Sequence, residues 1–154
     1  MNTNEIEKPK KKKMSVTYHP TRGSIVTVNF SPGFVPPEMV KRRLAIVLSP
    51  PIRARAGLCT IVPLSTTPPQ KEMPYHCTYT VPFAMPRNWG NVERWVKGDM
   101  VTTVGWHRVD LLALGKDKTG KRIYQRQAID DEDFTRIKRC VLHGMGLSAL
   151  TKHL

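Results

Sequence analysis

The chain has 154 residues, of which 25 are Lys or Arg and 12 are Asp or Glu, so its formal charge is +13. This length suits one domain with a self-sufficient hydrophobic core. No apolar run approaches the roughly 18 residues that a membrane-spanning helix needs. Its three cysteines show no CxxC or CxxH spacing, which argues against a disulfide-stapled secreted scaffold and against a structural zinc site. A reducing, cytoplasmic location is therefore expected.

The positive charge is not confined to one end of the chain. Residues 1–14 contain five lysines and two glutamates, yet the remaining 140 residues still carry a net charge of +10. A surplus of this size favours polyanionic partners, because neutralising phosphates releases their counterions. Nucleic acid is the partner class that the composition favours.

The chain divides into a lysine-rich arm, residues 1–19, and a single domain, residues 20–154. The run from Lys8 to Lys13 has no apolar periodicity and its like charges repel one another, so we expect the arm to be disordered. The arm also lacks the apolar segment of a signal peptide.

Short β-branched and apolar runs dominate the domain. Residues 24–30 alternate as a half-buried strand does, and residues 44–49 form a continuous apolar run typical of a central strand. The other expected segments are strands at 58–64, 75–81, 100–104 and 122–127, an irregular stretch at 82–98, and a short strand or helical turn at 108–114.

A single convincing helix is predicted near the end of the chain. Asp130 or Asp131 can cap it, and the acidic residues that follow suit the positive end of a helix dipole. One apolar face is formed by Phe134, Ile137, Val141 and Met145. Because closely spaced strands leave no room for crossover helices, the predicted fold class is mainly β: a small, strongly bent antiparallel barrel with the C-terminal helix packed against it.

Common catalytic motifs are absent from the sequence, which contains no GxSxG, HExxH, P-loop or GxGxxG pattern. Acidic residues are scarce outside the start of the helix, so a two-metal carboxylate nuclease would lack ligands. If the chain is an enzyme, we expect no metal and no other cofactor.

Cationic and hydroxyl side chains remain as candidates for chemistry. Arg43 directly precedes the buried strand at 44–49, while Ser65 and Thr66 follow the next strand. If these two strands pair antiparallel, Arg43 meets the hydroxyls, and a guanidinium beside hydroxyls suits a phosphate. Alternatively, Arg43 pairs with Glu38 on the surface and the hydroxyls only cap a turn.

Four blocks of this sequence, in the same order, resemble motifs of the MazF/PemK family of bacterial toxins. They are Gly23 to Phe30, Glu38 through Arg43 to Pro50, Val62 to Thr66, and Asp99 to Val109. The similarity covers about residues 20 to 145. The chain departs from the family pattern at Leu44 (usually Pro), Ser65 (usually Thr), Met100 (usually Gln) and Thr102 (usually Arg or Lys).

The resemblance implies a small SH3-like barrel with a C-terminal helix. It also implies a homodimeric, metal-independent endoribonuclease that cuts single-stranded RNA, with a cognate acidic antitoxin. Arg43 and Ser65 occupy the positions of the family's catalytic pair, with Thr66 as an alternative hydroxyl. The expected reaction is attack by the ribose 2′-OH, which leaves a 2′,3′-cyclic phosphate and a 5′-OH. His76 and His107 are candidate bases, because imidazole titrates near neutral pH. The candidate RNA-binding residues are Lys41, Arg42, Trp95, Trp106, His107 and Arg108.

Two non-catalytic functions remain open at this point. The same barrel can act as a partner-binding toxin, such as a topoisomerase poison, because a fold does not determine a function. It can also serve as a basic RNA-associated protein that binds in a salt-sensitive way without cutting.

Overall fold

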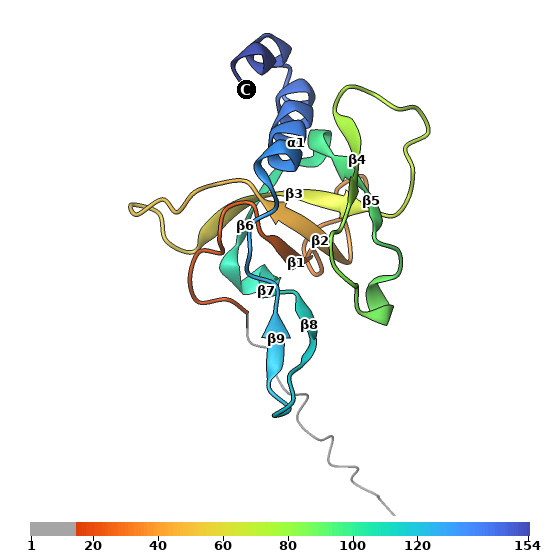
Figure 1. Ribbon diagram of the computed structural model, residues 1–154. Coiled ribbons are helices and arrows are strands. Elements are labelled where there is room, and N and C mark those ends of the chain that lie inside the picture. Colours follow the sequence, from red (N-terminus) through yellow and green to blue (C-terminus); the bar gives the residue numbers. More distant parts are fainter. Residues whose placement is uncertain (1–14) are drawn as a thin grey trace, which may run out of the picture.

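The computed structural model of the protein describes residues 15–154, which form nine strands and one α-helix (Figure 1). The strands are β1 (Ile25–Asn29), β2 (Arg42–Val47), β3 (Leu58–Ser65), β4 (His76–Thr80), β5 (Glu93–Lys97), β6 (Thr102–Gly105), β7 (Val109–Leu111), β8 (Ala113–Lys116) and β9 (Arg122–Tyr124). The helices are α1 (Asp131–Gly144) and the short 3-10 helices η1 (Arg87–Trp89), η2 (Gly98–Met100), η3 (Trp106–Arg108) and η4 (Ser148–His153).

The main sheet is antiparallel throughout and is built around β3. Its strand order is β4-β5-β3-β2-β1-β7, and β6 also pairs with β3. The first half of β3 pairs with β6, and the last two residues of β3 pair with β5. The remaining strands, β8 and β9, form a separate hairpin that projects from the body of the domain (Figure 1).

Alternation along β1 and β2 sends neighbouring side chains to two cores. Ile25 and Leu44 belong to the first core, whereas Val26 and Ala45 belong to the second. Strands β6 and β7 lie at opposite edges of the path β6-β3-β2-β1-β7, yet both contribute to the second core. The sheet therefore curls around this core, and the three residues of η3 join its two edges. The prediction of a mainly β, SH3-like barrel with a C-terminal helix is confirmed.

Helix α1 closes the first core. Its N-cap is Asp130, whose carboxylate accepts a hydrogen bond from the backbone N–H of Asp133 at 2.8 Å, as the sequence predicted. Ile137 is completely buried against the sheet and Cys140 nearly so. The predicted apolar face differs in one place: Met145 follows the last helical residue and is 59% exposed.

The prediction that residues 82–98 are irregular is wrong over their last third. Strand β5 lies there and pairs with both β3 and β4. Arg94 and Val96 point inward while Trp95 and Lys97 are half-buried, so the strand does alternate. An arginine in an inward position hides that alternation from sequence analysis.

The domain already makes contacts before residue 20. The backbone N–H of Val16 donates to the carbonyl of Val109 at 3.0 Å, and the His19 ring meets the edge of Trp106. The lysine run that suggested an arm lies outside the described residues, and the division at residue 19 stays a prediction. Within residues 15–154, no helix is both long and apolar enough to cross a bilayer.

The contact between α1 and β4 distinguishes the three cysteines. A hydrogen bond from Cys140 lowers the pKa of the Cys77 thiol, and the Arg136 guanidinium adds to this effect against partial burial. Burial raises the pKa of Cys59 to about 11.

Because the thiolate is the reactive form, iodoacetamide at mildly alkaline pH should alkylate Cys77 at least about tenfold faster than Cys59. Peptide mass mapping measures both rates. Equal alkylation rates of Cys77 and Cys59 in the folded protein would contradict this difference in reactivity. In the urea-unfolded chain, which is the control, the two rates should be equal.

Candidate active site

The two predicted catalytic residues lie at the ends of β2 and β3, just beyond the ladder that joins these strands. The ladder pairs Val47 with Ile61 and Ala45 with Pro63 in antiparallel sense. Continuing this register by two residues places Arg43 opposite Ser65. Both side chains then point to the same face of the sheet, as paired residues do.

Arg43 has most of its guanidinium available for a ligand. Its Nε donates to the carbonyl of Val40 at 3.0 Å, and within residues 15–154 neither of its Nη atoms has a hydrogen-bond partner. Glu38 does not neutralise it: this carboxylate accepts from the backbone N–H of Val35 at 2.8 Å. The alternative interpretation, an Arg43–Glu38 ion pair, therefore does not hold in this part of the chain.

Ser65 combines a structural bond with a free donor. It is 8% exposed, and its Oγ accepts from the backbone N–H of Thr67 at 3.1 Å, so it does cap a turn. Its hydroxyl hydrogen remains available to a bound oxygen. Thr66 is exposed on the turn itself. Of the two hydroxyls, Ser65 is the one that the continued register places opposite Arg43.

A buried arginine, Arg94, lies beside this pair, and sequence analysis gave no sign of it. Ser65 pairs with Trp95 across β3 and β5, and Arg94 is the next residue in β5. Arg94 is only 5% exposed, one Nη donates to the carbonyl of Trp89, and its Nε is enclosed without a partner. Burial lowers the pKa of Arg94, and the like charge of Arg43 lowers it further. The end of the sheet is thus strongly cationic.

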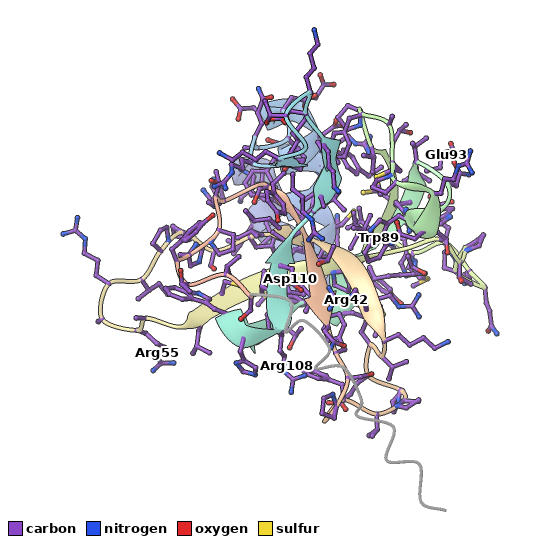
Figure 2. All side chains as sticks on the ribbon, turned by 90° about the horizontal axis from the view of Figure 1, so that it is seen from below. Arg42, Arg55, Trp89, Glu93, Arg108 and Asp110 are labelled. Atoms are coloured by element: carbon purple, nitrogen blue, oxygen red, sulfur yellow. The ribbon has the colours of Figure 1, made fainter. Side chains whose placement is uncertain are left out.

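Arg42 and Lys41, predicted to bind RNA, differ in how free they are. The Arg42 guanidinium donates to Asp110 Oδ2 at 2.8 Å and to Thr27 Oγ1 at 3.3 Å (Figure 2). Lys41 is exposed, and its left-handed backbone, with φ of 68°, closes the loop between β1 and β2. Arg42 is therefore held by contacts within the fold, and it would have to give up part of them to bind RNA.

The other four predicted RNA-binding residues are spread over the fold. Trp95 is half-buried and lies across from Ser65, close to the site. Trp106 and His107 follow Gly105, which pairs with Leu58, so they lie at the opposite end of β3. Seven residues of strand correspond to about 23 Å.

Arg108, the last of the four, connects two parts of the fold. It donates to the carbonyls of Asn29 and Pro32 at 3.2 and 2.9 Å and lies over the Phe34 ring. It therefore holds the β1–β2 loop in place.

The two candidate bases differ in their surroundings. The backbone N–H of Met73 donates to His76 Nδ1 at 3.2 Å, which leaves the proton on Nε2, 3.9 Å from Asp99 Oδ1. His107 is exposed, with its ring against Gly105. Neither ring is held between Arg43 and Ser65, so the identity of the base remains open.

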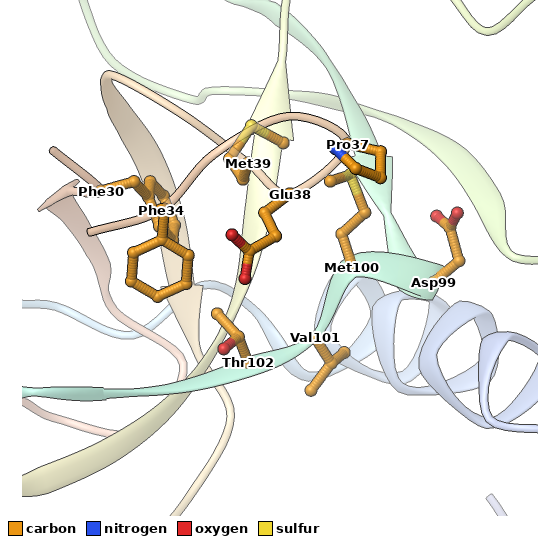
Figure 3. A pocket seen from close by; sticks show the side chains of 9 residues that line it. All are labelled: Phe30, Phe34, Pro37, Glu38, Met39, Asp99, Met100, Val101 and Thr102. Atoms are coloured by element: carbon orange, nitrogen blue, oxygen red, sulfur yellow. The ribbon is translucent and has the colours of Figure 1, made fainter. Parts of the chain in front are cut away.

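A cavity of about 460 Å³ lies between the β1–β2 loop and η2 (Figure 3). Its walls include Phe30, Phe34 and Met100, together with the carboxylates of Glu38 and Asp99. The Glu38 side chain points into the cavity from the segment that leads to Arg43 (Figure 3). Carboxylates repel phosphate but accept hydrogen bonds from base amino groups. Sequence analysis marked Glu38 as a possible partner of Arg43 and as part of a block that resembles the family, but it gave Glu38 no role in binding a base.

Metal ligands do not gather in the part of the chain that the structure describes. No three His, Cys, Asp or Glu side chains among residues 15–154 lie close enough together to hold an ion. The expectation of a reaction without metal stays a prediction for experiment.

Comparison with known proteins identifies the family. The family model described as PemK-like, MazF-like toxin of type II toxin–antitoxin system matches residues 21–143. The chain belongs to this family. A relative from Escherichia coli K12, the protein YifN, is 28% identical over 155 residues, which is 89% of this chain and 99% of the relative.

Solved structures support the fold of this PemK/MazF-like chain. MazF from Deinococcus radiodurans is 22% identical, with a TM-score of 0.54 over 84% of this chain and 98% of that one. The MazE–MazF complex of the same organism has a TM-score of 0.52, is 22% identical, and covers 85% and 99% of the two chains. A mycobacterial endoribonuclease solved with its cognate antitoxin is 16% identical, with a TM-score of 0.50 over 84% and 97%.

Proposed function

We propose that this PemK/MazF-like toxin is an endoribonuclease that cuts single-stranded RNA at short sequences without a metal ion. The observation that carries the proposal is the antiparallel register of β2 and β3, which, continued by two residues, sets Arg43 opposite Ser65 at a cationic end of the sheet. Within residues 15–154 both Nη atoms of Arg43 lack a hydrogen-bond partner. Membership of a family that includes endoribonucleases supports it.

The reaction is an internal transfer at phosphorus. The ribose 2′-oxygen loses its proton and bonds to the adjacent phosphorus, and the bond from phosphorus to the 5′-oxygen breaks. The products are a 2′,3′-cyclic phosphate and a 5′-oxygen that takes up a proton. Charge accumulates on the non-bridging oxygens in the transition state, so fixed donors aimed at them accelerate the reaction.

Arg43 and Ser65 serve as these donors. The free Nη atoms of Arg43 offer a planar fork to the two non-bridging oxygens. The Ser65 hydroxyl donates to one of them while its Oγ still accepts from Thr67. Thr66, exposed on the same turn, is the alternative hydroxyl donor. Lys41, Trp95 and the cation-rich surface guide the strand into place.

Two protein partners belong to the proposal. The net charge of +13 suits a cognate antitoxin with an acidic segment that competes with RNA. The antitoxin complexes of two structural neighbours support this partner. We also infer a homodimer in the cytoplasm, where messenger RNA is available, and light scattering measures the mass directly.

The test is a cleavage assay on a long, unstructured RNA, with and without EDTA. We expect discrete cuts that resist EDTA and new 5′-hydroxyl ends that polynucleotide kinase labels without prior phosphatase treatment. Cuts that vanish with EDTA, or 5′-phosphate ends, would overturn the mechanism. Intact RNA in every condition would overturn the enzymatic function and favour a partner-binding toxin.

A further inference from the structure

A second cavity, of about 410 Å³, lies between the η1 segment and the strands β7, β8 and β9. We call it the hairpin cavity; its walls include Asn88, Trp89, Leu112, Lys116 and Arg122. Its volume falls within the roughly 300–1,000 Å³ of small-ligand sites. An aromatic ring, an amide and two cations around an apolar floor are the groups that recognise an unstacked nucleotide.

The two cations of the hairpin cavity are placed where their repulsion destabilises the hairpin. Lys116 of β8 and Arg122 of β9 are directly paired across the two strands. Like charges directly opposite one another destabilise a β-ladder. A local arrangement that opposes stability is a sign of function. An anion bound between the two side chains relieves the repulsion.

Two arginines lie behind the inner wall of the hairpin cavity. Thr27 lines the cavity and accepts a hydrogen bond from Arg42, whose charge is paired with that of Asp110. Trp89 lines it too, and its carbonyl accepts from the buried Arg94. Within residues 15–154 no carboxylate pairs with Arg94, whose Nε is enclosed without a partner. Buried charges are normally paired, so Arg94 is a cation without a negative partner behind this wall.

We propose that the hairpin cavity binds an unstacked nucleotide of the RNA strand that Arg43 and Ser65 cut. This inference rests on the function proposed above. The base stacks on Trp89, the Asn88 amide reads a base edge, and Lys116 and Arg122 hold a flanking phosphate. Strand β5 connects the two places, because Arg94 supports Trp89 and the adjacent Trp95 pairs with Ser65.

The hairpin supplies its own matched control. Lys118 and Lys121 are exposed on the same hairpin but do not line the cavity. The pairs Lys116→Ala/Arg122→Ala and Lys118→Ala/Lys121→Ala each remove two positive charges. Both pairs change exposed side chains, so both variants should fold, which circular dichroism checks.

The experiment measures binding of a labelled, short, mixed-sequence RNA at several salt concentrations. All variants carry Arg43→Ala, which suppresses cleavage, so the RNA stays intact during the measurement. Binding can also be measured in this way if the chain is not a nuclease. We expect the cavity pair to weaken binding about tenfold. It should also reduce the slope of log K against log salt by about 0.7, the contribution of the single phosphate that the two side chains hold. The control pair should change both quantities far less.

Tryptophan fluorescence provides a second, independent readout. In the double variant Trp95→Phe/Trp106→Phe, Trp89 is the single remaining tryptophan, and the RNA should quench its fluorescence. Equal effects of the two hairpin pairs, or RNA binding that leaves Trp89 unquenched in this double variant, would overturn the nucleotide site. If the wild-type chain cuts RNA while the two pairs behave alike, this inference alone fails. If the wild-type chain does not cut, the proposed function fails whatever the cavity binds.

Discussion

Replacing Arg43 by alanine is expected to lower the rate of RNA cleavage by about 100- to 1,000-fold, the loss that follows removal of one donor to a transition-state oxyanion. The loss should fall on kcat more than on KM, because the guanidinium acts on charge that develops during the reaction. Arg43→Lys should recover only part of the rate, since an ammonium keeps the charge but not the planar fork. Single-turnover cleavage of a labelled RNA measures all three proteins.

The fold should survive this substitution. The hydrogen bond from Arg43 Nε to Val40 is the only one that its side chain makes within residues 15–154, and such a bond contributes about 1 kcal/mol. Thermal melting therefore separates lost chemistry from lost structure. Arg55→Ala is the matched control, because Arg55 is exposed on a loop away from Arg42 and Asp110 (Figure 2). If Arg43→Ala cut RNA as fast as Arg55→Ala, the catalytic assignment of Arg43 would be wrong.

The meeting of Arg43 with Ser65 was predictable because two simple patterns determine it. Residues 44–49 and 58–64 are apolar runs of strand length, and short connections force neighbouring strands to be antiparallel. The start of one strand must then lie beside the end of the next. Period-two alternation fixes which face each side chain takes, so the pair could be placed without coordinates.

Arg94 could not be found in this way, because its position contradicts the usual behaviour of its residue type. Arginine is almost never buried without a partner. In its segment, Glu93 to Lys97, two charged residues are followed by Trp95 and Val96, so charged and apolar side chains do not alternate. Only the pairing of β5 with both β3 and β4 shows that Arg94 is inside and next to the site.

The aromatic residues show a different limit of sequence reasoning. Trp95 and Trp106 are only eleven positions apart, and both neighbour basic residues. Pairing of β5 and β6 with different halves of β3 places them at opposite ends of that strand. Because sequence analysis used closeness along the chain, it overestimated how many of the candidate residues can reach the same RNA phosphate.

The second large effect is expected at the contact between α1 and η2. A methyl group added at Gly98 would lie 2.6 Å from the carbonyl oxygen of Cys140 and 2.7 Å from that of Tyr75. Both neighbours are backbone atoms of packed elements, so neither can move aside as a flexible side chain does. We expect Gly98→Ala to lower the free energy of unfolding by about 3 kcal/mol, the upper part of the usual range for overpacking. Urea unfolding measures it.

Gly57→Ala is the control for the loss of glycine itself. Gly57 has a φ of 89° but nothing within 4 Å of an added methyl group. Its substitution should therefore show only the backbone strain of a left-handed residue, about 1 kcal/mol. Equal losses at the two positions would mean that the close approach of α1 to η2 does not limit packing.

A double variant tests whether the helix moves as a unit. Gly144 of α1 faces the same contact from the other side, since its added methyl group would lie 2.5 Å from the carbonyl oxygen of Gly98. If α1 shifts outward to make room for the methyl group at one of these positions, the methyl group at the other position enters space that this shift has already opened. The double variant Gly98→Ala/Gly144→Ala should then lose less than the sum of the two single losses. Asp99 and Met100 of η2 line the cavity beside Glu38, so this shift should also weaken RNA cleavage. Full additivity with unchanged cleavage would show that the helix and the site are independent.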